Sequence, residues 1–397
     1  MARPLVPLGS VIATVGFMGA FTLPFLTLFL STAVGADPAR TALYLFLVPL
    51  AGIALATMLG RWSDRPGRRR PALLLPVLAG AAGYAAFAVV RDFWLLLAVA
   101  VTVVAASGAA FPQSFAFARA VLDGQGSTRT PAVMNVLRML VSVAWVAGPP
   151  VAAVTLAALD FTGFYLVVAA GYVVAALILV TRVAEPPPRP EPADPDAPAG
   201  AAPGATLWLA AAAFFLIQAA AGLNILAMPL YLTADLHGSV HDAGWVLALC
   251  ALLEIPLMLG MGALTARIPV RHLVVAGTGV GVGYFVLVAV AQSTWHVMAA
   301  QVLNACFIAA SAGLGISYVQ DLLPGAPGRA TTTFANTHRL SGMLAGPLLS
   351  LSQHLGYRSA YAAGALLCGG GLLLLLAVPA GAGPVRTATG AAARSGP

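Results

Sequence analysis

The sequence predicts an all-α membrane protein with twelve transmembrane helices in two pseudo-symmetric six-helix halves, and three observations point to this fold class. The 397 residues are 60% hydrophobic and only 8% charged, with a mean hydropathy of +0.92, whereas soluble domains carry about 25% charged residues. Twelve apolar stretches are long enough to cross a bilayer, and motifs of the first six recur in the last six. The composition excludes a soluble enzyme, a disordered protein and a nucleic-acid-binding protein.

The predicted helices follow from length, because a transmembrane helix needs about 20 mostly apolar residues. The spans are predicted at residues 8–30, 40–60, 71–90, 94–117, 131–156, 162–181, 206–232, 243–264, 272–291, 294–318, 331–353 and 358–379. Residues 1–181 and 206–379 then form the two six-helix halves. The proline-rich segment 182–205 is predicted to be an extended cytoplasmic linker, and residues 380–397 a cytoplasmic tail.

The basic residues predict the orientation, and all 20 of them are arginines. With a cytoplasmic N-terminus, the inner segments hold 15 arginines and the outer loops hold only Arg40, Arg91 and Arg358. By the positive-inside rule, both termini are expected in the cytoplasm. The remaining two, Arg138 and Arg339, fall inside predicted helices.

An internal repeat supports the division into halves. Asn135-x-x-Arg138 recurs 201 residues later as Asn336-x-x-Arg339, and each copy is followed on its helix by Ala-Gly-Pro. These Gly-Pro elements, with the proline after the first, are predicted to bend helices or let them approach closely: Gly148, Pro149, Pro150, Gly346 and Pro347. Parallel repeats of this kind place a substrate site near the midplane between the halves.

A charged loop follows the second predicted span. Residues 60–70 read GRWSDRPGRRR, which resembles the signature loop of the major facilitator superfamily, and the copy after the eighth span lacks the acid because Ala266 replaces it. We interpret the loop as a gating latch on the cytoplasmic side, although basic loops also orient any membrane protein. The residues assigned to the latch are Gly60, Asp64, Arg65, Gly67 and Arg68.

A narrower resemblance runs over most of the chain. The segments 115–119, 137–138, 142–150, 320–325, 330–332 and 336–339 look like those of the bacterial sugar efflux transporters. The resemblance implies proton-driven export of small sugars and glycosides from the bacterial inner (plasma) membrane. It implies no cofactor, because the proton gradient supplies the energy, and we expect a monomer whose partners are its substrate, protons and membrane lipid.

One polar face in the fifth span is the leading candidate for substrate binding. At about 100° per residue, Asn135, Arg138, Ser142 and Trp145 fall within an arc of about 80°. A guanidinium and an amide can hold sugar hydroxyls, and an indole can lie against a sugar ring. Arg138 could instead clamp helices together or reach the cytoplasmic surface. Asn336 and Arg339 mirror this face in the eleventh span, with the same alternatives.

Glu254 is the one acid predicted deep in a helix, near the centre of the eighth span. We predict that it carries the coupled proton, and the alternative is a protonated packing residue beside Pro256. The membrane-depth amides Gln113, Gln218, Asn224 and Asn304 either line the substrate cavity or bind neighbouring helices.

The sequence contains no Walker-type phosphate loop, no HExxH and no CxxC, so we expect neither catalysis nor ATP-driven transport. His237 and His241 are four residues apart but have no further ligands nearby, so no metal site is predicted. The function predicted is a secondary exporter of sugars or glycosides that works by proton antiport with alternating access. The alternatives are an exporter of a drug or secondary metabolite and, from another class, a membrane sensor that binds a solute without moving it.

Overall fold

The structure is a computed structural model that describes residues 5–63, 65, 67–124, 130–185, 204–323 and 327–379. Side chains are not described for Leu5, Asp123, Asn135, Arg138, Arg339 or residues 130–132, 327–329 and 331–332. In the described ranges all regular secondary structure is helical.

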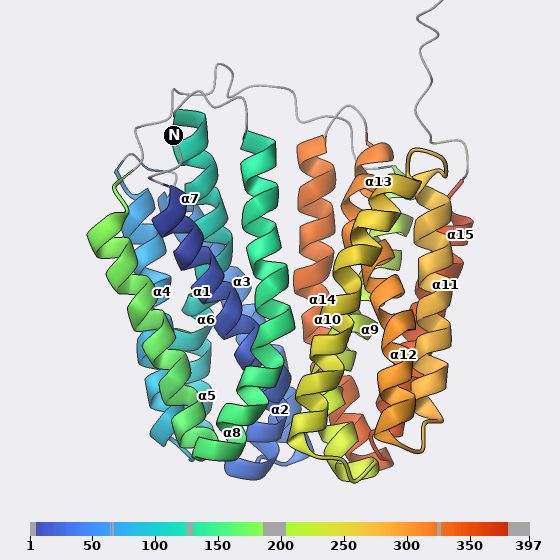
Figure 1. The fold of residues 1–397 in the computed structure, drawn as a ribbon, viewed down its shortest axis with the longest axis horizontal. Helices are drawn as coiled ribbons and strands as arrows, with labels where there is room; N and C mark the ends of the chain where they lie inside the picture. Colours follow the sequence, from blue (N-terminus) through green and yellow to red (C-terminus); the bar gives the residue numbers. More distant parts are fainter. Residues whose placement is uncertain are drawn as a thin grey trace, which may run out of the picture.

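Six membrane-length segments form the N-terminal half (Figure 1). The first breaks its α-helical pattern where Pro24 interrupts the backbone hydrogen bonds. In chain order the elements are α1 (Leu5–Thr22), η1 (Leu23–Phe25), α2 (Leu26–Leu28), η2 (Phe29–Ala33), α3 (Pro38–Ser63), α4 (Arg69–Val89), α5 (Phe93–Val99), η3 (Ala100–Val104), α6 (Ala105–Ser107), α7 (Ala110–Gly124) and α8 (Thr130–Arg182). Element α8 holds the fifth and sixth spans, which meet at a sharp bend at Asp160 (φ 55°, ψ −169°).

The C-terminal half repeats this order. Its elements are α9 (Ala205–Leu230), η4 (Tyr231–Asp235), α10 (Val240–Leu264), α11 (Val270–Ala289), α12 (Thr294–Ile308), η5 (Ala309–Gly313), α13 (Gly315–Asp321), α14 (Pro327–Leu355) and α15 (Arg358–Ala377). Irregular helical turns again occur in its first and fourth spans, η4 and η5, as η2 and η3 do in the other half.

The twelve predicted spans are all present, although only ten described helices are both long and apolar enough to count as membrane-spanning. The difference has two causes. The fifth and sixth spans form one continuous element, α8, and α14 is too polar in its described part to count although it is 29 residues long. Many spans extend beyond their predicted ends, because the apolar core of each sequence stretch does not mark where helical hydrogen bonding stops.

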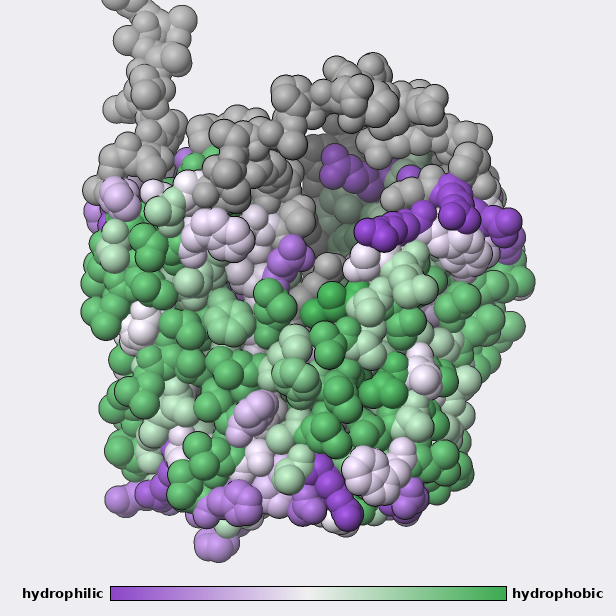
Figure 2. Space-filling model, turned by 180° about the vertical axis from the view of Figure 1, so that it is seen from behind, coloured by the Kyte–Doolittle hydropathy of each residue, from purple (hydrophilic) through white to green (hydrophobic). Residues whose placement is uncertain are grey.

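The molecule has two ends. We call the end where α8 stops and α9 starts the linker face, and the opposite end the far face, where α3, α5, α10, α12 and α15 begin. Figure 2 shows a broad hydrophobic band between them, with hydrophilic residues gathered toward both ends. Exposed leucines and valines in this band face lipid, as expected for helices that cross a bilayer.

The two halves touch near the far face. A methyl group added at Gly244 of α10 would lie 2.8 Å from Cβ of Ala153 and 2.9 Å from the carbonyl oxygen of Pro149, both in α8. One added at Gly346 of α14 would lie 2.7 Å from Cβ of Leu45 in α3. Toward the linker face α8 and α10 diverge (Figure 1). The halves are therefore closed against each other on the far side and splayed on the linker side.

Candidate functional site

The first part of the site is a face of α8 that points toward the opposite half. The adjacent face of α8 packs on α1, where Gly9 meets Leu137 and Gly16 meets Val141. Counting about 100° per residue, Ser142 and Trp145 fall in one arc of about 80° with Pro149 and Ala153.

Because Pro149 and Ala153 contact α10 of the other half, Ser142 and Trp145 lie on the linker side of that contact, where the halves diverge. Both side chains are partly exposed. Asn135 and Arg138 belong to the same helix, but their side chains lie outside the described part of the structure. The predicted face therefore stands where a site between the halves requires it, and the contacts of its arginine stay a prediction.

In the C-terminal half, α9 and α14 contribute a second polar pair. The amide nitrogen of Gln218 donates to the hydroxyl of Thr337 at 3.2 Å. The other amide atom of Gln218, Oε1, is buried and accepts no hydrogen bond from the described residues. Asn336 is exposed on α14, and the side chain of Arg339 lies outside the described part. An unpaired buried acceptor costs about 1–3 kcal/mol, and this one is enclosed by protein, so a ligand does not reach it in this structure.

Three further amides of the C-terminal half, those of Asn224, Gln301 and Asn304, belong to a buried network. Tyr284 donates to Oδ1 of Asn224 at 2.9 Å, and Nδ2 of Asn304 donates to Oε1 of Gln301 at 2.9 Å and to Sγ of Cys250 at 3.2 Å. Asn224 and Asn304 are only 4% and 2% exposed. These groups satisfy one another and join α9, α10, α11 and α12, which matches the helix-binding alternative; contact of Asn224 or Asn304 with substrate stays a prediction.

Glu254 lies one helical turn after Cys250 on α10, beyond the end of this network. Its side chain is partly exposed, and it forms no ion pair with any side chain in the described part of the chain. Within the described part of the chain this carboxyl group has no fixed positive partner. Its role as the proton carrier stays a prediction.

Three comparisons with known proteins place the chain in a family. The sequence matches the Major Facilitator Superfamily over residues 8–220 and 210–395. It is 38% identical to a Deinococcus radiodurans protein named for sugar efflux transport, with 87% of this chain and 89% of the relative covered. It is 34% identical to sugar efflux transporter A of Dickeya chrysanthemi (89% and 91% covered) and 30% identical to sugar efflux transporter A of Escherichia coli (87% and 88% covered).

The chain belongs to the major facilitator superfamily. Within it, the chain is a member of the sugar efflux transporter family. Solved structures agree on the superfamily fold. A variant of the nucleoside transporter NupG aligns with a TM-score of 0.77 at 12% identity, covering 94% of this chain and 98% of that one. A POT family peptide transporter aligns with a TM-score of 0.76 at 14% identity, covering 95% and 96%.

The superfamily loop after α3 has a defined geometry where it is described. Gly67 has a φ of +67°, a left-handed conformation that favours glycine and explains why the motif carries one there. The Arg68 guanidinium lies 5.8 Å from the Trp62 ring centroid. Asp64 lies outside the described residues, and Arg65 is exposed. Gln113, buried at 8% exposure, lies near Gly60 at the linker end of α3 rather than at mid-membrane.

The sequence did not reveal what holds this superfamily loop. The Glu185 carboxylate, just after α8, accepts hydrogen bonds from the backbone N–H groups of Arg69 (2.8 Å) and Arg70 (2.9 Å) at the start of α4. The Arg70 guanidinium donates to the carbonyl oxygen of Val180. Arg271 makes the equivalent contact in the other half, donating to Leu376 at 3.3 Å. The 201-residue spacing of Arg70 and Arg271 is the signal that could have found this pair.

The Gly-Pro elements play different parts in the two halves. Gly148 lets α8 approach α1, since an added methyl group would lie 2.9 Å from Cβ of Ala20 within the same half. Pro149 and Pro150 face α10, and Gly346 faces α3, so these residues form the contact between halves. Pro347 is exposed. Helices therefore approach closely at Gly148 and Gly346, and the predicted bending by these elements stays a prediction.

Proposed function

We propose that this chain is a secondary exporter of small sugars or glycosides that couples efflux to the inward movement of protons. The observation that carries the proposal is its similarity, along 87% of its length, to a relative named for sugar efflux, with up to 38% identity. Substrate would bind between the halves on the linker side, and rocking of the halves would expose the site to each side in turn. We expect a monomer in the inner membrane.

The candidate site has the chemistry for a sugar. Trp145 offers a flat apolar surface for a ring, while Ser142 offers a hydroxyl partner for the hydroxyls of a sugar. In this proposal Arg138 and Asn135 complete the site on α8, and Glu254 on α10 carries the proton.

Transport into everted vesicles tests the proposal. We expect a panel of labelled sugars to include at least one that accumulates when a proton gradient is imposed and does not accumulate when the gradient is collapsed. Glu254→Gln keeps the shape and hydrogen bonding of the side chain but cannot titrate. It should retain substrate binding and lose accumulation. If Glu254→Gln still accumulates sugar against a gradient, Glu254 does not carry the proton; if no sugar is moved, the substrate class is wrong.

The proposed orientation places the linker face in the cytoplasm. Nine described arginines lie in or beside its connections, namely Arg61, Arg65, Arg68, Arg69, Arg70, Arg119, Arg182, Arg267 and Arg271. A reporter active only in the periplasm, fused to the C-terminus, should give no signal, whereas the same reporter inserted in the loop before α15 should be active. The reverse pattern would mean that the linker face lies in the periplasm and that the proposed orientation is wrong.

A further inference from the structure

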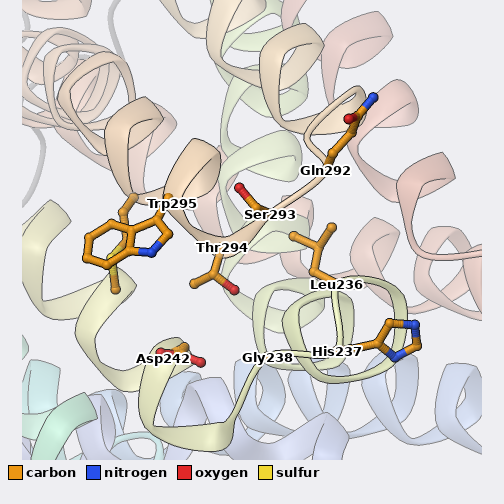
Figure 3. A pocket seen from close by; sticks show the side chains of 9 residues that line it. Leu236, His237, Gly238, Asp242, Gln292, Ser293, Thr294 and Trp295 are labelled. Carbon is orange, nitrogen blue, oxygen red and sulfur yellow. The ribbon is translucent and has the colours of Figure 1, made fainter.

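A cavity of about 340 Å³ opens on the far face of the C-terminal half, away from the space between the halves (Figure 3). It lies between the segment that joins η4 to α10 and the segment that leads into α12. Its floor is Gly238: a methyl group added there would lie 2.9 Å from Oγ1 of Thr294 and 3.3 Å from Oδ2 of Asp242. Volumes of roughly 300–1,000 Å³ are typical of small-molecule sites.

The N-terminal half provides an internal comparison, because its matching residues lie 201 or 202 positions earlier. There, Phe93 stands in place of Thr294 and Arg40 in place of Asp242. Phe93 is buried at 3% exposure, and the Arg40 guanidinium lies 5.7 Å from the centre of its ring. The two larger side chains occupy the position that the C-terminal half leaves open. The cavity is thus not a necessary consequence of the fold, since small polar residues take the place of a stacked pair.

The lining mixes apolar and polar side chains and carries an acid but neither arginine nor lysine. The Asp242 carboxylate accepts from the backbone N–H (2.7 Å) and hydroxyl (2.9 Å) of Ser239, and both bonds use Oδ2. Its Oδ1 therefore remains for a donor from a ligand. Thr294, Ser293 and Gln292 add hydroxyl and amide groups. An anion would meet the Asp242 charge without a compensating cation, so the lining suits a neutral ligand with several hydroxyls.

An aromatic side chain borders the cavity. Trp295 is 77% exposed, and in Figure 3 the edge of its indole that carries the nitrogen faces Thr294. The His237 ring points away from Thr294 and Asp242. An indole beside hydroxyl, amide and carboxylate groups can hold a sugar ring through both its apolar surface and its hydroxyls.

We propose that this cavity is a second binding site, for a monosaccharide or a terminal glycosyl unit, on the far face of the C-terminal half. It lies outside the path between the halves and therefore goes beyond the proposed export. Binding here would occur on the side to which substrate is released. The site does not require Glu254, Arg138 or rocking of the halves, so it can be tested separately from transport.

The test is binding of D-glucose to the full chain in lipid nanodiscs, followed by saturation-transfer NMR. Thr294→Phe introduces the residue that fills the matching position of the other half, and it should weaken binding at this site by about tenfold or more. Trp295→Ala is the second variant, and it leaves the floor of the cavity intact. Trp94→Ala is the matched control, because Trp94 is the exposed counterpart of Trp295 beside the filled position and should leave binding unchanged.

Trp145→Ala distinguishes the far-face cavity from the central candidate site. It alters only the central site, so binding of D-glucose at the far face should persist. The melting temperature of each variant controls for folding. Equal binding by the wild type, Thr294→Phe and Trp295→Ala would overturn the proposal, and so would an equal loss in Trp94→Ala. If choline saturates the site and D-glucose does not, the cavity binds a cation and the sugar assignment is wrong. None of these outcomes depends on whether vesicles transport sugar.

Discussion

Arg91 lies on the far face, which the arginine count predicts to be the exterior. Its contacts explain why a basic side chain occurs there. It donates to the carbonyl oxygens of Phe87 (2.8 Å), Ala88 (2.9 Å) and Val90 (3.0 Å) at the end of α4, and to the hydroxyl of Thr162 (2.9 Å). Its guanidinium also lies 5.6 Å from the centre of the Phe29 ring. Arg358 plays a similar part in the other half by donating to Ala291 beyond the end of α11. These arginines cap the C-terminal ends of α4 and α11 by donating hydrogen bonds to the carbonyl oxygens there.

We therefore expect Arg91→Ala to lower the free energy of unfolding by about 1.5–3 kcal/mol, because charge-assisted hydrogen bonds to four acceptors are lost. Thermal unfolding in detergent measures this as a lower melting temperature. Arg40→Ala is the control on the same face, because Arg40 has only an exposed ion pair with Asp37 (3.5 Å), worth about 0.2–1 kcal/mol, and a ring contact with Phe93, worth about 0.5–1 kcal/mol. Equal losses in the two variants would contradict the capping role.

The periodicity of a helix was enough to predict the face that holds Ser142 and Trp145, because residues on one helix keep their relative directions whatever surrounds them. It could not predict which amides meet. Asn224, Gln301 and Asn304 come from two helices and find partners on two others, and Gln113 lies near the linker end beside Gly60. Such contacts depend on tertiary packing, which hydropathy does not encode.

At the scale of elements, Glu185 ties the end of α8 to the start of α4. The first N–H groups of a helix have no partner within it, and a carboxylate that accepts two of them both completes their hydrogen bonds and favours the helix dipole. Glu185 lies more than a hundred positions from Arg69 and Arg70 in the sequence. No local pattern predicts this contact, because Glu185 falls within the predicted linker 182–205 and its partners lie at the start of another helix.

Glu185→Ala should therefore loosen the first turn of α4, at a cost of about 0.5–2 kcal/mol. Trypsin does not cleave between Arg70 and Pro71, but limited digestion should cleave after Arg68 and Arg69 several times faster than in the wild type. Glu191→Ala removes one negative charge from the same linker and serves as the matched control. Unchanged cleavage in Glu185→Ala would mean that other contacts, such as Arg70 with Val180, are enough to hold the turn.

At the scale of the whole molecule, the sequence predicted the all-helical fold, the twelve spans and the repeat, because apolar length and a repeated motif are both local properties. It did not predict which side of the molecule is closed. That depends on where small residues of one half meet the other: Gly244 against Pro149 and Ala153, and Gly346 against Ala42 and Leu45. Gly244 and Ala42 are themselves counterparts, 202 residues apart, so the closure has the symmetry of the repeat.

The contact at Gly244 leaves no space for a larger side chain, because an added methyl group already lies 2.8–3.2 Å from Ala153, Pro149 and Pro150. Gly244→Leu should therefore destabilise the far-side closure, since overpacking costs about 1–3 kcal/mol. A change of that size moves a two-state equilibrium roughly 5- to 150-fold toward a form open on the far side.

Spin labels on Arg40→Cys and His241→Cys, exposed positions in the first turns of α3 and α10, report the separation across the far face. The longer-distance population should grow in Gly244→Leu. Gly260→Leu is the matched control on the same helix, because an added methyl group at Gly260 would meet nothing within 4 Å, and it should leave the distances unchanged. Gly244→Leu could instead give the wild-type distance distribution with an unchanged melting temperature. In that case α8 and α10 accommodate the larger side chain, and their contact at Gly244 does not control closure of the far side.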